Sequence, residues 1–129
     1  MTNRKKILIT DDDPITRKLE EAILQDTGYD IRSVESGQAT LDEVAANPPD
    51  LILLDLMMPK MDGFEVARRL KADPVTSAIP IVMVTAIDDV GSRSRLAVVG
   101  VSDVITKPLD RWALLASIDK LLGNKNGNA

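Results

Sequence analysis

The fold is decided by one stretch of the sequence, which reads Asp50-Leu-Ile-Leu-Leu-Asp-Leu-Met-Met-Pro-Lys-Met-Asp-Gly63. Its residues 51–54 are all apolar. A strand with one solvent-exposed face would alternate apolar and polar residues, so this run predicts a strand covered by helices on both sides. That strand ends at a carboxylate, Asp55, and a turn containing proline and glycine leads into a helix over about 64–71. The stretch therefore predicts a parallel sheet with an acidic side chain at the end of a buried strand.

The same alternation of short apolar runs and amphipathic segments recurs five times along the chain. We expect strands at 7–9, 31–34, 51–54, 79–84 and about 103–106, and helices at about 14–26, 36–46, 64–71, 90–99 and 110–122. In the first helix, Ile15, Leu19 and Ile23 recur at every fourth residue and predict one apolar face. The pattern indicates an α/β fold, a doubly wound five-stranded parallel sheet of order 2-1-3-4-5. We expect one flavodoxin-like (βα)5 domain over 1–122 and a disordered tail at 123–129.

Composition narrows the possible functions. The 129 residues include no cysteine and no histidine, which excludes thiol chemistry, disulfides and imidazole as base or metal ligand. A net charge of −4 argues against nucleic acid as a partner, and no apolar run approaches the roughly 20 residues of a membrane span. We expect a cytoplasmic protein with no membrane contact.

Polar side chains follow the predicted strands where each strand ends. Asp11 and Asp12 follow the first strand, Asp55 the third, Thr85 the fourth and Lys107 the fifth. In such sheets, ligands bind outside the carboxyl ends of the strands. Carboxylates brought together there need protons or a cation, and an oxygen-rich site suits Mg²⁺. A carboxylate held beside Mg²⁺ can attack a phosphoryl group. A hydroxyl and an ammonium nearby can then bind the remaining oxygens of that phosphoryl group.

Each of these residues taken alone could have a purely structural role, since aspartates after strands often cap helices and threonines at strand ends are usually structural. Only their joint occurrence indicates a site. A flavodoxin would need a Ser/Thr-rich phosphate loop where this chain has acidic residues. A haloacid-dehalogenase-type phosphatase uses two aspartates two apart, as Asp11 and Asp13 are, but Ile15 stands where Thr or Val is expected.

With these motifs in view, the chain resembles the receiver domains of bacterial two-component response regulators over about 5–122. Four motifs carry the resemblance: Ile7-Leu-Ile-Thr-Asp-Asp-Asp-Pro14, the stretch 50–63, Ile79-Pro-Ile-Val-Met-Val-Thr-Ala86, and Thr106-Lys-Pro108. The middle segments are most similar to receiver modules of diguanylate cyclase regulators.

The resemblance implies a phosphorelay function in signal transduction. Asp55 would accept a phosphoryl group from a sensor histidine kinase, a histidine phosphotransfer protein or a small phosphodonor, and the domain would then switch a protein-binding face. Asp11, Asp12, Asp55 and the Met57 carbonyl would bind Mg²⁺, with Mn²⁺ as a substitute. Thr85 and Lys107 would hold the phosphoryl oxygens, and Lys107-Pro108 would be a cis peptide. The chain would not be an enzyme beyond its own phosphorylation and dephosphorylation. The alternative is a degenerate receiver that acts as a constitutive interaction module.

The chain departs from the family pattern at the position three before the lysine, where Val104 replaces the aromatic residue that usually changes its packing on activation. Five residues at or near the segments 90–99, 103–106 and 110–122 are unusually apolar: Leu96, Val98, Val99, Val104 and Trp112. We hypothesise that they form an exposed face for an unidentified downstream protein or a homodimer. Equally, they could pack inward. Met57 and Ile87, two residues after Asp55 and Thr85, predict slow hydrolysis of the phosphoryl group.

Overall fold

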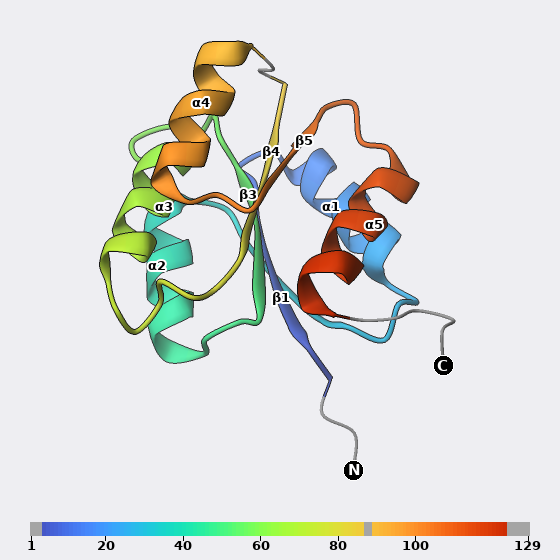
Figure 1. Ribbon diagram of the computed structural model, residues 1–129. Helices are drawn as coiled ribbons and strands as arrows, with labels where there is room; N and C mark the ends of the chain where they lie inside the picture. Colours follow the sequence, from blue (N-terminus) through green and yellow to red (C-terminus); the bar gives the residue numbers. More distant parts are fainter. Residues whose placement is uncertain (1–3, 87–88, 124–129) are drawn as a thin grey trace.

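The computed structural model describes residues 4–86 and 89–123 (Figure 1). One parallel sheet has the strand order β2-β1-β3-β4-β5, as the sequence predicted. The strands are β1 Lys6–Thr10, β2 Asp30–Val34, β3 Leu51–Asp55, β4 Ile81–Thr85 and β5 Asp103–Thr106. The helices are α1 Pro14–Leu24, α2 Gly37–Ala46, α3 Gly63–Ala72, α4 Val90–Val99 and α5 Arg111–Leu122. The predicted flavodoxin-like α/β fold is confirmed.

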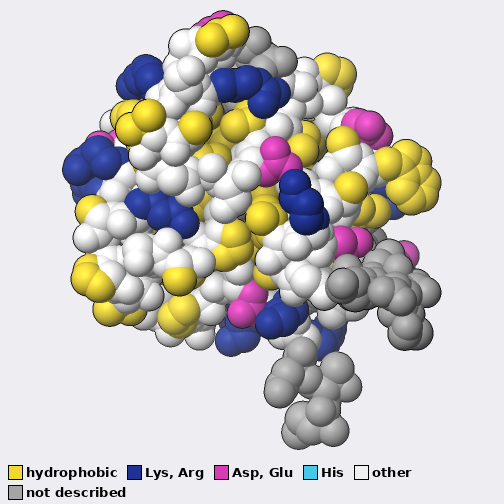
Figure 2. All heavy atoms as spheres, in the orientation of Figure 1, with side chains coloured by type: hydrophobic (Ala, Val, Ile, Leu, Met, Phe, Trp, Pro, Cys, Tyr) yellow, Lys and Arg dark blue, Asp and Glu magenta, His cyan; other side chains and the backbone are white. Residues whose placement is uncertain are grey.

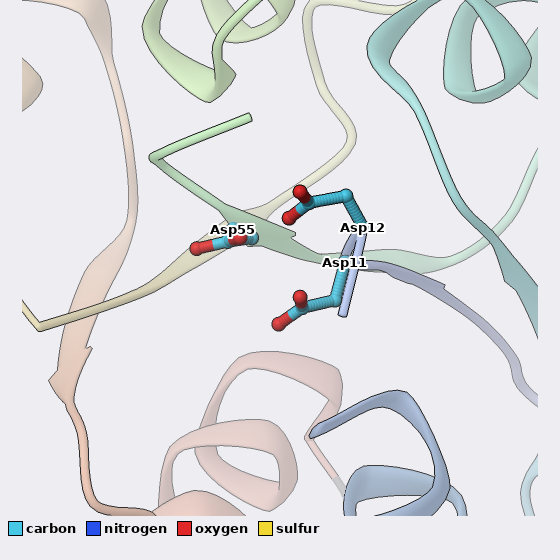
Figure 3. Close-up of side chains that lie close together, drawn as sticks. All are labelled: Asp11, Asp12 and Asp55. Carbon is cyan, nitrogen blue, oxygen red and sulfur yellow. The ribbon is translucent and has the colours of Figure 1, made fainter. Parts of the chain in front are cut away.

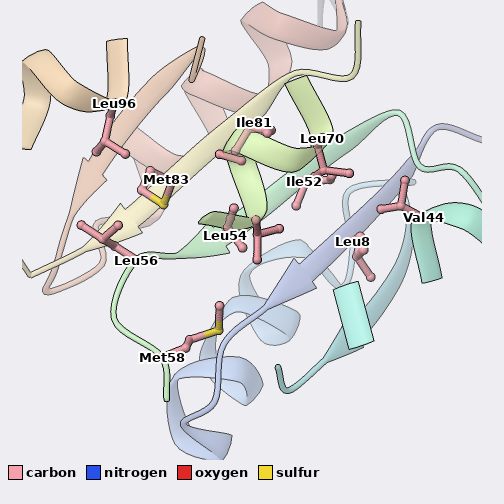
Figure 4. Close-up of a cluster of buried hydrophobic side chains, with 12 residues drawn as sticks. Leu8, Val44, Ile52, Leu54, Leu56, Met58, Leu70, Ile81, Met83 and Leu96 are labelled. Carbon is pink, nitrogen blue, oxygen red and sulfur yellow. The ribbon is translucent and has the colours of Figure 1, made fainter. Parts of the chain in front are cut away.

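Helices cover both faces of the sheet, with α1 and α5 on one side and α2, α3 and α4 on the other (Figure 1). On the second side, residues such as Leu8, Ile52, Leu54 and Met83 pack against Val44, Leu70 and Leu96 of the helices (Figure 4). Every residue of β3 and β4 is buried. That burial explains why these two strands read as unbroken apolar runs in the sequence.

Short polar side chains fix where the helices begin. The N-cap residues are Asp13, Ser36, Asp62, Asp89 and Asp110, and each accepts a hydrogen bond from a backbone N–H in the first turn of its helix. Pro14 lies in the first turn of α1, where its missing N–H does no harm. The caps anchor the loops that join the carboxyl ends of the strands to the helices.

The prediction that Ile15, Leu19 and Ile23 form the buried face of α1 is wrong for Ile15 and Leu19. Ile23 is buried, but Ile15 and Leu19 are 77% and 48% exposed. Four residues advance an α-helix by more than one turn, so a stripe with this spacing rotates by about 40° at each step. The side of α1 that packs inward carries Glu20, Ile23 and Leu24 instead.

Other boundaries differ by a few residues from the sequence prediction. Strand β4 begins at Ile81, because Pro80 has no N–H to donate and contributes only its carbonyl, which accepts from the Ile52 N–H at 3.0 Å. Gly123, expected in the disordered tail, caps α5 with a φ of 70°. The rest of that tail, 124–129, lies outside the described residues. Within 4–86 and 89–123, no helix is long and apolar enough to cross a membrane.

The predicted partner face is wrong for Leu96, which is 2% exposed and belongs to the core that α2, α3 and α4 cover. Val99 and Val104 are half-buried against the same core. Leu96 and Val99 are three residues apart and share the inner side of α4, whereas Val98 points away from it. Of the five residues predicted for this face, only Val98 and Trp112 are exposed, at 87% and 74%. Figure 2 shows hydrophobic side chains on α4 and α5 interspersed with charged groups.

Candidate phosphoacceptor site

Three carboxyl groups meet at the carboxyl end of the sheet. Asp11 and Asp12 directly follow β1, and Asp55 is the last residue of β3, the neighbouring strand. Their side chains point to the same side of the sheet edge (Figure 3), and one oxygen of each lies within 4.8 Å of the others. Asp11 and Asp55 are buried, while Asp12 is exposed. The prediction that these residues come together is confirmed.

Lys107 supplies the positive charge at this edge. Its Nζ lies 3.3 Å from Asp11 Oδ2 and 3.4 Å from Asp55 Oδ1. Its backbone N–H donates to the Thr85 carbonyl at 2.8 Å, which ties the loop after β5 to the end of β4. The Lys107-Pro108 peptide bond is cis, as expected.

The remaining predicted site residues lie at the same edge. Thr85 ends β4 next to Thr106 of β5 and is fully buried. Met57 follows Asp55 by two residues, and its side chain is 61% exposed. Ile87, paired with Met57 in the prediction of slow hydrolysis, lies outside the described residues.

Burial and crowding set the protonation of Asp55. Burial, together with the negative charge of Asp11, raises the pKa of Asp55 to about 6, although Lys107 opposes the rise. Burial alone would lower the pKa of Lys107, but Asp55 and Asp11 outweigh it and raise that pKa. One ammonium is therefore insufficient to compensate the neighbouring carboxylates.

The donor set fits a divalent cation. Three carboxylates converge, and their electrostatic repulsion, visible in the raised pKa of Asp55, is what a bound cation would relieve. Carboxylate and carbonyl oxygens are the ligands that Mg²⁺ prefers. Asp11, Asp12 and Asp55 are the residues that could hold it.

Sequence reasoning missed three residues that interact with this edge. The Arg17 guanidinium donates from Nη1 to the Asp11 carbonyl at 2.7 Å. Gly63 approaches the backbone of Asp55 so closely that a Cβ would overlap the Asp55 carbonyl oxygen. Glu20, on the inner side of α1, is 1% exposed. The Asp62-Gly63 pair at the start of α3 signalled a tight turn, but nothing in the sequence signalled the other two.

The fold and the edge together define a class: a doubly wound α/β domain with an acidic cluster and a lysine at the point where the strand order reverses. The chain belongs to the response regulator receiver domain family, whose model matches residues 7–119.

Individual relatives agree with this assignment. The chain is 43% identical over 116 residues to the response regulator PleD of Caulobacter vibrioides, covering 90% of this chain and 26% of PleD. It is 39% identical over 117 residues to RpaA of Synechocystis, a DNA-binding transcriptional regulator, covering 91% of this chain and 48% of RpaA. The chain therefore spans at most about half the length of these relatives.

Solved structures show the same architecture. The signal receiver domain of a signal transduction histidine kinase from Syntrophus aciditrophicus matches with a TM-score of 0.85 and 32% identity, over 97% of this chain and 95% of that one. The chemotaxis protein CheY4 of Vibrio cholerae matches with a TM-score of 0.88 and 27% identity, over 93% of this chain and all of CheY4. The chain is thus a receiver domain in sequence and in fold.

Proposed function

We propose that this receiver domain is a Mg²⁺-dependent switch that accepts a phosphoryl group on Asp55 from a histidine kinase or a histidine phosphotransfer protein. The observation that supports this most strongly is the position of Asp55, which is 4% exposed at a strand end and shares the ammonium of Lys107 with the carboxyl of Asp11. A carboxylate held this way is a nucleophile whose surroundings can neutralise an incoming phosphoryl group.

In the proposed reaction, a carboxylate oxygen of Asp55 forms a bond to phosphorus as the bond from phosphorus to the donor's imidazole nitrogen breaks. The electron pair of that bond stays on the imidazole. When bound, Mg²⁺ offsets charge on the phosphoryl oxygens. The Lys107 ammonium, 3.4 Å from Asp55 Oδ1, donates to one of these oxygens, and the Thr85 hydroxyl donates to another. The pKa of Asp55 is about 6 before a cation binds, so below that pH Mg²⁺ must displace a proton from the nucleophile, and the reaction needs more Mg²⁺ to reach the same rate.

The donor protein would have to cover the rim of the site. Ile15 and Leu19 lie one turn apart on the outer side of α1, directly after the acidic loop, and both are exposed. An exposed apolar strip beside a phosphorylation site suits the apolar side of a donor helix. Ile15→Ser should therefore slow transfer from a phosphorylated donor protein but not from acetyl phosphate.

Of the five residues predicted to bind a downstream partner, Val98 and Trp112 are the two that remain exposed. We propose that the α4–β5–α5 side contacts a target protein or a second copy of the chain. Val104 has no ring to rotate, so its half-buried packing would transmit the switch by a shift of β5 against α4. Light scattering with and without phosphorylation tests the homodimer.

Acetyl phosphate with Mg²⁺ tests the central proposal. Intact-mass measurement should show the addition of one phosphoryl group to the wild-type chain and none to Asp55→Asn. Asp13→Asn is the matched control, because Asp13 caps α1 through Ile15 and Thr16 and lies outside the three-carboxylate cluster. An unmodified wild-type chain would favour the alternative, a degenerate receiver that binds its partner constitutively.

A further inference from the structure

Glu20 is an acidic side chain in an apolar setting. It lies on the inner side of α1 beside Ile23 and Leu24 and is 1% exposed. Its Oε1 atom is buried and accepts no hydrogen bond from any residue in the described part of the chain. Because an ionised carboxylate with an unpaired, buried oxygen is strongly unfavourable, the group is stable there with its proton attached.

The charged groups that act on Glu20 come from the strand ends and from its own helix. Burial, together with the negative charge of Asp11, raises the pKa of Glu20 to about 8, although Lys107 opposes the rise. Asp55 and Glu21 contribute smaller repulsions to the same shift. Two of these groups, Asp11 and Asp55, belong to the cluster that fits a divalent cation. The proton of Glu20 and the charge of that cluster are therefore linked.

We propose that Glu20 is a buried proton donor that couples divalent-cation binding at the phosphoacceptor site to the release of one proton. The inference rests on the metal-binding part of the proposed function. Without metal, three carboxylates face one ammonium, and two negative charges remain uncompensated. A divalent cation cancels them, so the repulsion that holds the proton on Glu20 weakens while the attraction of Lys107 remains. The O–H bond of the carboxyl breaks, its electron pair stays on Glu20, and the proton passes to the buffer.

A pH window separates Glu20 from the metal ligands. Asp55 has a pKa of about 6 and also loses its proton when a cation binds at lower pH. Near pH 7 most Asp55 is ionised whereas most Glu20 is not, so most of the proton release at that pH comes from Glu20. Coupling of one proton makes the affinity for the cation rise with pH, by at most about tenfold per pH unit.

The test is calorimetric titration of Mg²⁺ into the full chain in two buffers with different heats of ionisation. The wild-type chain should release a proton on binding, and its affinity should rise severalfold between about pH 6.5 and 7.5. Glu20→Gln should bind Mg²⁺ with little proton release near pH 7 and with an affinity that changes much less over this range, the remainder coming from Asp55. Glu43→Gln is the matched control, since Glu43 lies on α2 and forms an ion pair with Arg32 at 3.7 Å, and it should behave like wild type.

The outcomes distinguish the two levels of the proposal. If Mg²⁺ did not bind the wild-type chain, the metal site and the coupling would both be overturned. Equal proton release in wild type and Glu20→Gln would overturn only the role of Glu20. Should Glu20→Gln not fold, the ¹³C shift of the Glu20 carboxyl in the wild-type chain decides. Its titration midpoint must fall when Mg²⁺ saturates the site, and an unchanged midpoint overturns the coupling.

Discussion

The carboxyl edge of the sheet and the inner side of α1 both keep carboxyl groups out of water, but they do so differently. At the edge, Asp11 and Asp55 are at most 4% exposed, and a lysine lies within 3.4 Å of each. On α1, Glu20 is equally buried, yet its Oε1 has no donor in the described part of the chain. The Lys107 ammonium stabilises buried charge in the first region, whereas in the second the carboxyl group stays buried by keeping its proton and remaining neutral.

Replacement of Glu20 tests this difference most directly. The folded chain holds the Glu20 proton up to a pKa of about 8, while the unfolded chain loses it near 4.5. The free energy of unfolding of the wild-type chain should therefore fall as pH rises through this window and level off above it. Glu20→Leu lacks that slope and fills the space with an apolar side chain. We expect it to be more stable by on the order of 3 kcal/mol at pH 9, and by much less at pH 5.

Urea unfolding at both pH values measures the effect. The shift of Asp55 from 3.8 to about 6 adds a second slope at lower pH, which wild type and variant share and which cancels in the comparison. Glu21→Leu should not reproduce the gain. A stability difference between wild type and Glu20→Leu that is the same at pH 5 and pH 9 would contradict a protonated Glu20.

Removal of the Lys107 ammonium should leave the carboxylates at the sheet edge without a positive partner, so that they too become stable in the folded chain only when protonated. Lys107→Met leaves Asp11 and Asp55 without their shared ammonium, and we expect a loss of about 1–3 kcal/mol at pH 8. The loss should shrink at pH 5, where Asp55 carries a proton, and Mg²⁺ should restore part of it at pH 8. Lys18→Met, an exposed lysine on α1, is the control. A loss that does not depend on pH would point to packing by the lysine stem instead.

The two regions also differ in how well the sequence predicted them. The edge was predictable because each polar residue follows a strand, and a parallel sheet brings all strand ends together whatever the details of packing. Asp11, Asp55 and Lys107 meet there as expected. The burial of Glu20 depends instead on the rotation of α1. There the regular spacing of Ile15 and Leu19 predicted the wrong face, because both of these apolar residues point to solvent.

The same limit applies to α4. Leu96 and Val98 are both apolar and only two residues apart, so composition cannot tell which one faces the sheet. Packing of β5 and α3 against α4 decides, and those contacts lie far away in the sequence. Element order and strand ends are thus readable from local pattern, whereas helix orientation requires the tertiary structure.

A smaller effect on stability is expected in the loop after β3, where one residue has an unfavourable backbone conformation. Lys60 has a φ of 70°, a left-handed conformation that disfavours residues with a Cβ. Lys60→Gly should stabilise the fold by about 0.5–1 kcal/mol, the relief of strain being partly offset by the greater freedom of the unfolded chain. Lys60→Ala, which keeps the Cβ and removes the charge, should give no gain. If both variants gained equally, the charge of Lys60 and not its backbone would be responsible.

Val98 is the reverse case of Glu20, because it is an apolar side chain exposed to water. Its replacement should have the smallest effect on stability. At 87% exposure, Val98→Ser removes almost no buried surface, so stability should change by less than about 0.5 kcal/mol. Leu96→Ala, on the inner side of the same helix, should cost about 2–5 kcal/mol and shows that the assay detects losses in α4. A large loss from Val98→Ser in dilute solution would mean that another surface covers this side chain. Light scattering of the wild-type chain and of Val98→Ser would then test for a second copy. A dimer mass for the wild type and a monomer mass for the variant would identify the covering surface as a second copy.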